Sequence, residues 1–343
     1  MPGGRRGIKV KLMMLDPVVI AVVVFAFVFG FVVQRGSICG VLAARQIVET
    51  GGTSRVRSFI TASLWAFAVV IPLAWIAPDS FALTPSYGGA GVALAGGALY
   101  GLGTIVNGAC VFGTASRALS GNLSFAAALP GIAGGAVLAG MMQLYRLHGA
   151  ASPSPLLRPS PIAWALLLVV MVLAAATLAG IVRSHHRAGI RFAQVLRAAR
   201  WRTSLAMLLI GIIGGVLFAG GGAWSYPSLM RQAGNAAAGL PASFPLVTLL
   251  GPLALVAGGL VSVRLGGRFA MRRLSLKQIV RSGTGGIIMG IASSLVPGGN
   301  DVLLLAGLPS LGMHAALAYT AMLAMQLGLL WSSLQWRLAH RER

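Results

Sequence analysis

The two cysteines of this chain, Cys39 and Cys110, both stand where a run of apolar residues is interrupted by glycine and polar side chains. A thiol is a soft, polarizable group that suits a sulfur-containing partner better than a hard ion. Two such cysteines without a Cys/His cluster predict neither a disulfide framework nor a metal site. We interpret the pair as contacts for a soft substrate, with the alternative that each is a small packing residue.

Other polar candidates lie in similar interruptions. Asp301 is one of only five acidic residues in the chain. An ionisable group in apolar surroundings is costly unless it is used, so Asp301 either caps the helix that follows or binds a proton or substrate hydrogen. Arg117 would attract an anion or anchor a helix end. Asn107 and Asn300 are candidate polar neighbours, and Trp224 would line the same pathway or lie at a membrane interface.

The composition indicates the elements that position these residues. Hydrophobic residues make up 57% of the 343 residues and charged residues only 9%, a mixture that predicts an integral membrane protein. Apolar runs such as 17–33, 162–182 and 315–336 approach the roughly 20 residues that a helix needs to cross a bilayer. No nucleotide-binding loop, zinc-protease motif or catalytic Ser/His/Asp set is present, so we expect no cofactor and no enzyme of these classes.

The apolar pattern predicts an all-α fold, a single membrane domain over 1–343, with nine crossings at 17–33, 57–77, 91–106, 125–145, 162–182, 203–218, 245–264, 284–296 and 313–336. The net charge of +22 would suggest nucleic acid in a soluble protein. Here the basic residues lie in short loops, where they orient a membrane protein, so we expect a lipid bilayer and no nucleic acid as partner.

Orientation follows from the same basic residues. With the N-terminus outside, 20 of the 27 Lys and Arg residues fall in cytoplasmic segments. The N-terminal tail argues the other way, because it carries Arg5, Arg6, Lys9 and Lys11.

The spacing of the crossings suggests an inverted repeat. The helix at 162–182 is bracketed by a Pro-rich stretch and a basic loop, with four crossings before it, at 17–145, and four after it, at 203–336. An odd linking helix turns the second half upside down relative to the first, as in many transporters with a central site.

Four interruptions, two in each half, fall inside this pattern. They occupy 35–40, 107–110, 220–226 and 297–301, and short stretches such as 40–48 and 111–119 after them can form half-helices. Irregular backbone at membrane depth is tolerated only where protein or a water-filled cavity satisfies its polar groups. The start of a half-helix presents unpaired N–H groups and a positive dipole end, so the four breaks predict a central site for an anion.

These segments resemble the YeeE/YedE family of sulfur-compound membrane transporters. The resemblance rests on Gly-Ser-Ile-Cys at 36–39, on Asn-Gly-Ala-Cys-Val-Phe-Gly at 107–113 with Arg117 downstream, on the Gly-rich break before Trp224, and on Gly-Gly-Ile-Ile-Met-Gly at 285–290 followed by Pro-Gly-Gly-Asn. It implies nine crossings with four inserted half-helices in an hourglass of two pseudo-symmetric halves.

The resemblance also implies a function. It implies uptake of thiosulfate across the inner membrane, with the ion passed between cysteines by transient S–H–S hydrogen bonds and then met by a small cytosolic sulfur-carrier protein. Cys39 and Cys110 match two of the family's cysteines. The usual Pro-Gly-Cys-Asn reads Pro-Gly-Gly-Asn here, so the third cysteine is replaced by Gly299.

We therefore expect a transporter or channel for thiosulfate or a related sulfur anion, with a pathway constricted by the cysteines. Two rivals remain open. One is a sulfur-transfer enzyme that forms a cysteine persulfide, and the other is a signalling subunit that senses the sulfur compound.

Overall fold

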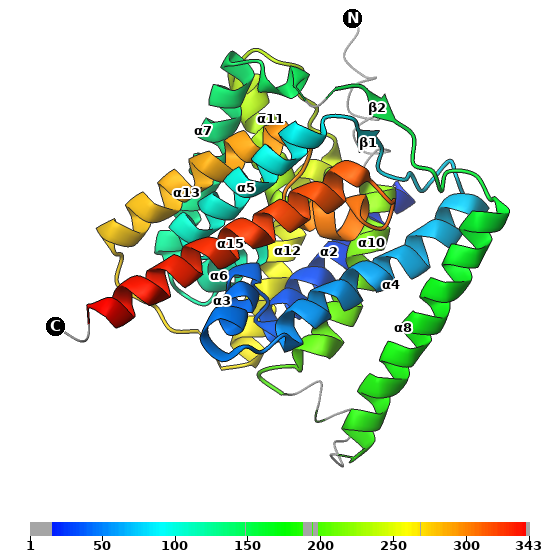
Figure 1. The fold of residues 1–343 in the computed structure, drawn as a ribbon, viewed down its shortest axis with the longest axis horizontal. Coiled ribbons are helices and arrows are strands. Elements are labelled where there is room, and N and C mark those ends of the chain that lie inside the picture. The colour runs from blue at the N-terminus through cyan, green and yellow to red at the C-terminus, as the bar shows by residue number, and fades with distance from the viewer. Residues whose placement is uncertain (1–15, 148, 188–193, 195–197, 268, 341–343) are drawn as a thin grey trace, which may run out of the picture.

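The computed structural model describes residues 16–147, 149–187, 194, 198–267 and 269–340, and is almost wholly helical (Figure 1). The basic N-terminal tail lies outside these residues. The long helices are α2 Pro17–Gly36, α4 Ser54–Ile76, α5 Ala90–Asn107, α7 Ala128–Met141, α8 Pro161–Arg187, α10 Thr203–Gly221, α12 Leu246–Leu265, α13 Leu276–Leu295 and α15 Met313–Ala339.

Short elements fill the connections between them. Four follow the interruptions, namely α3 Gly40–Thr50, α6 Val111–Leu119, α11 Tyr226–Ala237, and α14 Asn300–Val302 continued by the π-helical turn η3 Leu303–Gly307. Two 3₁₀ turns are η1 Leu123–Ala127 and η2 Leu144–Arg146, and two strands, β1 Ser86–Tyr87 and β2 Ala151–Ser152, pair antiparallel. Among the described residues, eight helices are long and apolar enough to cross a membrane, or nine if the bent pair of α13 with 300–307 counts as one. The predicted all-α membrane fold is confirmed.

Two predicted helix boundaries are wrong for local reasons. The helix expected from 284 begins at Leu276, because the hydroxyl of Ser275 accepts a hydrogen bond from the Gln278 N–H at 3.3 Å and caps a polar first turn. The helix expected from 125 to 145 is shorter, since its first residues form the 3₁₀ turn η1 and α7 ends at Met141.

Helix pairs pack in a recurring arrangement. α2 packs on α12, and α10 packs on α4. Likewise, α5 packs on α15 and α13 packs on α7. Two further contacts, α2 with α10 and α5 with α13, join these pairs. Glycine permits these close approaches. A Cβ atom on Gly101 would lie 2.6 Å from the Met322 carbonyl oxygen of α15, so a larger residue would force the helices apart.

The helix α8 stands at the edge of the bundle, where its main packing partner is α4 (Figure 1). The rings of Trp75 and Trp164 lie 4.7 Å apart, and the Trp65 indole N–H donates to the Thr177 hydroxyl at 3.1 Å. This is the helix predicted at 162–182 between the two groups of crossings.

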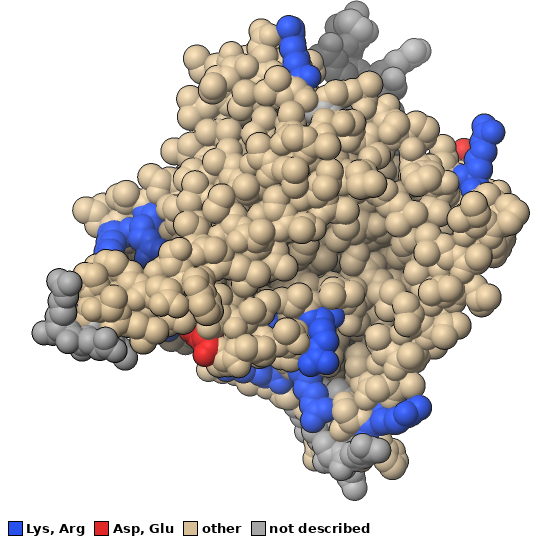
Figure 2. Space-filling view, viewed as in Figure 1, with Lys and Arg blue, Asp and Glu red and all other residues tan. Residues whose placement is uncertain are grey.

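The outer surface of the bundle suits a bilayer. Figure 2 shows a broad face without charged side chains, with Lys and Arg at its rim. Large apolar side chains are exposed on several helices, including Val24, Ile60, Leu168, Val172 and Leu253. In water such a continuous apolar surface would aggregate, so this face contacts lipid.

Candidate functional site

The four short helices begin at the ends of the predicted interruptions: α6 starts directly after one, and α3, α11 and α14 start within the last two residues of theirs. Their N-cap residues are Cys39 for α3, Cys110 for α6, Ser225 for α11 and Gly299 for α14, all with extended backbone. The segment predicted as a half-helix at 111–119 matches α6 as observed, and the one predicted at 40–48 ends two residues later, at Thr50.

The first two N-caps bring the cysteines together. The thiols of Cys39 and Cys110, called the thiol pair below, lie side by side and are buried, with exposed fractions of 3% and 1%. The Gly40 N–H donates to the Cys110 sulfur at 3.1 Å, so the first turn of α3 supplies a hydrogen bond to the cysteine of α6. These sulfur atoms therefore lie where the beginnings of two helices meet.

A glycine makes room for this arrangement. A Cβ atom on Gly113 would lie 2.6 Å from the Cys39 sulfur and 3.0 Å from its Cβ. Gly113 is in the first turn of α6, so the Cys39 thiol rests directly on the backbone of that helix. By contrast, a Cβ atom on Gly40 would lie 3.9 Å from the Cys110 sulfur, an ordinary contact.

A basic cavity of about 740 Å³ opens onto Cys39. We call it the vestibule. Among the described residues, four arginines and no acidic residue line it; the arginines are Arg55, Arg117, Arg200 and Arg272. The Arg117 guanidinium lies 4.9 Å from the centre of the Phe125 ring. A cavity lined by one sign of charge concentrates counter-ions, so the vestibule favours an anion at the thiol pair.

A cluster of oxygen groups lies at the other two N-caps, Ser225 and Gly299. The carboxyl group of Asp301 lies beside the Ser225 side chain, and a Cβ atom on Gly299 would lie 2.6 Å from Asp301 Oδ1 and 2.9 Å from the Tyr100 hydroxyl. Asp301, Ser225 and Tyr100 are called the carboxyl cluster below. The Tyr100 hydroxyl and the Asp301 carboxyl thus occupy the space into which a side chain at position 299 would point.

Three further predicted residues are buried beside these groups. The Asn107 amide donates to the Ala109 carbonyl at 2.8 Å and to the Thr114 hydroxyl at 2.7 Å, so it holds the turn that leads into α6. Asn300 is 1% exposed, at the start of α14. Trp224 is 1% exposed inside the bundle, which differs from the interfacial alternative considered for it.

Aromatic side chains pack around a small cavity that Asp301 also lines. The Trp224 ring lies 5.1 Å from the Phe29 ring and 5.2 Å from the Phe218 ring, and Phe29 lies 6.0 Å from Phe112. They enclose, together with Ser225 and Asp301, a cavity of about 10 Å³, room for roughly one water molecule. A cavity of this size has no room for a polyatomic anion.

Another cavity, of about 310 Å³, lies on the side of α11 and the last break. We call it the second cavity. Arg231, Asn235, Ser293 and Pro297 are among its lining residues. Sequence reasoning missed Arg231, as it missed Tyr100 and three of the vestibule arginines. The sequence feature that could have identified Arg231 is that it is a lone cation, six residues into a half-helix.

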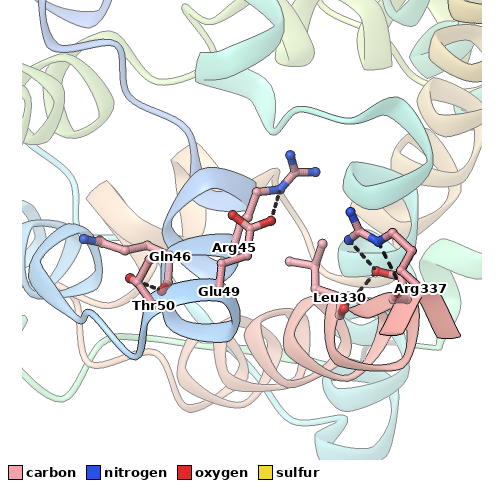
Figure 3. Close-up of polar contacts among 7 residues, drawn as sticks. Arg45, Gln46, Glu49, Thr50, Leu330 and Arg337 are labelled. Carbon is pink, nitrogen blue, oxygen red and sulfur yellow. Dashed lines mark hydrogen bonds and ion pairs between the residues drawn. The ribbon is translucent and has the colours of Figure 1, made fainter. Parts of the chain in front are cut away.

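The far end of α3 is polar and solvated. Arg45 Nε and Glu49 Oε1 lie 3.7 Å apart, and the Thr50 hydroxyl donates to the Gln46 carbonyl at 2.8 Å (Figure 3). The neighbouring end of α15 carries Arg337, whose guanidinium donates to the Ser333 carbonyl at 3.1 Å. Both charges of the Arg45–Glu49 pair are about half exposed, so this pair marks a surface rather than a pathway.

The sequence model of a family described as sulphur transport matches residues 35–328, which include the thiol pair and the carboxyl cluster. No curated protein matches the chain. Within the described part of the chain, no group of three or more His, Cys, Asp or Glu side chains is placed to hold a metal ion.

Proposed function

Since this chain belongs to the sulphur transport family, we propose that it carries thiosulfate or a closely related sulfur anion inward across a bacterial-type inner membrane. Family membership and a multi-pass helical fold together make the chain a membrane protein of sulfur-compound transport. The identity of the anion and the route through the cysteines are the finer parts of the proposal.

The observation that carries the proposal is the position of the thiol pair. Cys39 and Cys110 are the chain's only cysteines, they touch each other at the starts of two helices, and Cys39 opens onto the vestibule. Polarizable sulfur and backbone N–H groups solvate a soft sulfur anion without requiring a fixed counter-charge. If Cys39 served only as a small packing residue, it would not need to border a cavity lined by arginines.

The polar groups on either side define a route. On the route that we propose, the anion enters at Arg231 and the second cavity, and passes Ser225, Asn300 and Asp301 before it reaches the thiol pair. Arg117 and its three partner arginines then hold the anion in the vestibule. The aromatic barrier around Trp224 opens during passage, because the cavity beside it is too small for an anion of this size.

We place the vestibule on the cytoplasmic side, since basic residues favour that side of a membrane. In this orientation, a small cytosolic sulfur-carrier protein would meet the anion at the vestibule. The two halves, 17–145 and 203–336, would be related by an inverted two-fold axis with α8 as the linking helix. The helix packing supports this two-fold relation, because the contact of α2 with α12 has a counterpart in the contact of α10 with α4.

A rival of a different class is a sulfur-transfer enzyme. There a cysteine thiolate attacks the sulfane sulfur of thiosulfate, breaks its S–S bond, keeps that sulfur as a persulfide and releases sulfite. Mass spectrometry of Cys39 and Cys110 after exposure to thiosulfate separates the two ideas. A conduit leaves both thiols unmodified, whereas a persulfide on either would favour the enzyme.

Uptake by purified protein tests the proposal directly. Proteoliposomes take up sulfur-labelled thiosulfate, with sulfate and sulfite as competitors, and the Cys39→Ala/Cys110→Ala variant serves as the comparison. We expect uptake that depends on the cysteines and resists competition by sulfate. Wild-type vesicles that take up no thiosulfate would reject this anion, and equal uptake by the variant would reject the route.

A further inference from the structure

We propose that Asp301 is the proton-binding group that couples inward movement of the anion to inward movement of H⁺. This inference rests on the proposed function and adds a driving force to it. The carboxyl group binds a proton from the second cavity, stays neutral while the anion passes, and releases the proton toward the vestibule.

The first support is the burial of the carboxyl group without a counter-ion. Asp301 is 2% exposed, and its Oδ1 atom has no hydrogen-bond partner within the described part of the chain. No ion pair to Asp301 is found there either. The Ser225 side chain contacts this carboxyl group, but a buried charge without an ion pair is still costly, so the carboxyl is a candidate for a proton relay.

The second support is the set of groups around it. The titratable and charged groups that face Asp301 are Tyr100 of α5 and Tyr226 and Arg231 of α11, while α6 brings Cys110 at its start. Only Arg231 is a cation, and it lines the second cavity. It is close enough to interact with Asp301 through space but does not form an ion pair with it. This geometry lets the carboxyl alternate between a neutral form and an anion near Arg231.

The third support is the place of Asp301 on the proposed route. It borders the same small cavity as Ser225 and Tyr226, which has room for roughly one water molecule that could carry a proton. On the proposed route, an anion that moves from the second cavity to the thiol pair passes this point. An ionised Asp301 would repel it and a protonated Asp301 would not, so proton binding and anion passage are linked at one group.

Steady-state accumulation in vesicles tests the coupling. Proteoliposomes buffered inside are diluted into medium one pH unit more acidic, with the membrane potential clamped at zero, and sulfur-labelled thiosulfate is the probe. With one proton per anion, one pH unit supports an accumulation of up to about tenfold over equal concentrations. Because the ratio is read at steady state, slower transport by a variant does not change the result expected of it.

Three variants sharpen the test. Asp301→Asn should lower the accumulation ratio to about one, while Asp301→Glu, which keeps a titratable group, should keep a ratio clearly above one. Asp16→Asn makes the same chemical change at the exposed cap of α2, where Asp16 accepts from the Val18 N–H at 2.9 Å. It should accumulate thiosulfate like the wild type.

A measurement on the wild type covers the case in which Asp301→Asn does not fold. A pH-sensitive dye trapped in the vesicles should report acidification of the lumen when thiosulfate is added outside. Cysteine-dependent uptake without acidification, or an Asp301→Asn ratio equal to the wild type, would overturn the coupling and leave the proposed function standing. Absence of thiosulfate uptake by wild-type vesicles would overturn both.

Discussion

The thiol pair and the carboxyl cluster occupy corresponding places at the starts of short helices, yet they offer a passing anion different chemistry. Cys39 and Cys110 present two soft sulfur atoms next to a basic vestibule. Ser225 and Asp301 present hard oxygen atoms, and Gly299 contributes no side chain at all. The helix start supplies backbone N–H groups in both places. Under the proposed function, the backbone would set where the anion binds, while the cap residues would set which anion is selected.

The first test of this comparison displaces a thiol without removing it. Gly113→Ala places a methyl group 2.6 Å from the Cys39 sulfur, so the thiol pair must separate. Overpacking of this kind costs about 1–3 kcal/mol, and we expect thiosulfate uptake to fall by about tenfold or more. Initial uptake rates in proteoliposomes measure it.

The matched control is Gly40→Ala, whose new methyl group would lie 3.9 Å from the Cys110 sulfur. It should lose much less uptake than Gly113→Ala. Equal losses in the two variants would show that helix rigidity matters and that the distance between the thiols does not.

The second test gives the carboxyl cluster the family's thiol. Gly299→Cys puts a Cβ atom 2.6 Å from Asp301 Oδ1 and 2.9 Å from the Tyr100 hydroxyl. We expect uptake to fall by roughly tenfold, because the carboxyl must move. Adding Asp301→Ala should recover part of that loss by freeing the space, a coupling that a double-mutant cycle quantifies.

Gly134→Cys is the control for this test, since a Cβ atom at Gly134 meets nothing within 4 Å. It should keep normal uptake. If Gly299→Cys alone transports as well as the wild type, the carboxyl cluster is not packed as described here.

A smaller effect is expected from the vestibule. Arg117→Gln combined with Arg272→Gln removes two of its four cations. Weaker attraction should raise the apparent KM several-fold with little change in kcat, and added salt should reduce the difference between variant and wild type. Arg146→Gln, outside the vestibule, is the control. A fall in kcat at constant KM would contradict an attracting role.

The smallest effect is expected at Ser225. Ser225→Ala removes the hydroxyl beside Asp301 but keeps the cap backbone. Loss of one such contact costs about 1 kcal/mol, so uptake should fall by about fivefold at most. A loss as large as that of Gly113→Ala would mean that the carboxyl cluster constrains passage as strongly as the thiol pair.

Much of this architecture is visible in the sequence because glycine and polar residues stand out in apolar runs. Cys39, Cys110, Asn300 and Asp301 were predicted beside half-helix starts, and the short helices begin there. The start of α13 was missed because a polar first turn behind Ser275 carries no apolar pattern. Hydropathy marks membrane depth well and capped surface turns poorly.

Residues that reach a site from a distant element escaped prediction. Tyr100 belongs to the middle of α5 and comes to Gly299 only through packing of α5 against the end of the chain. Arg200 and Arg272 lie in loops whose basic residues were assigned to membrane orientation alone. Local pattern identifies which residues are unusual, but not which of them meet.

The central claim is that thiosulfate passes the thiol pair. Its most direct test is the initial rate of sulfur-labelled thiosulfate uptake by proteoliposomes that contain wild-type protein or Cys110→Ala, at equal protein content and with folding checked in detergent. We expect a loss of about hundredfold or more in the variant, the effect of removing a group that the passing ion must contact. Uptake by Cys110→Ala at the wild-type rate would contradict it.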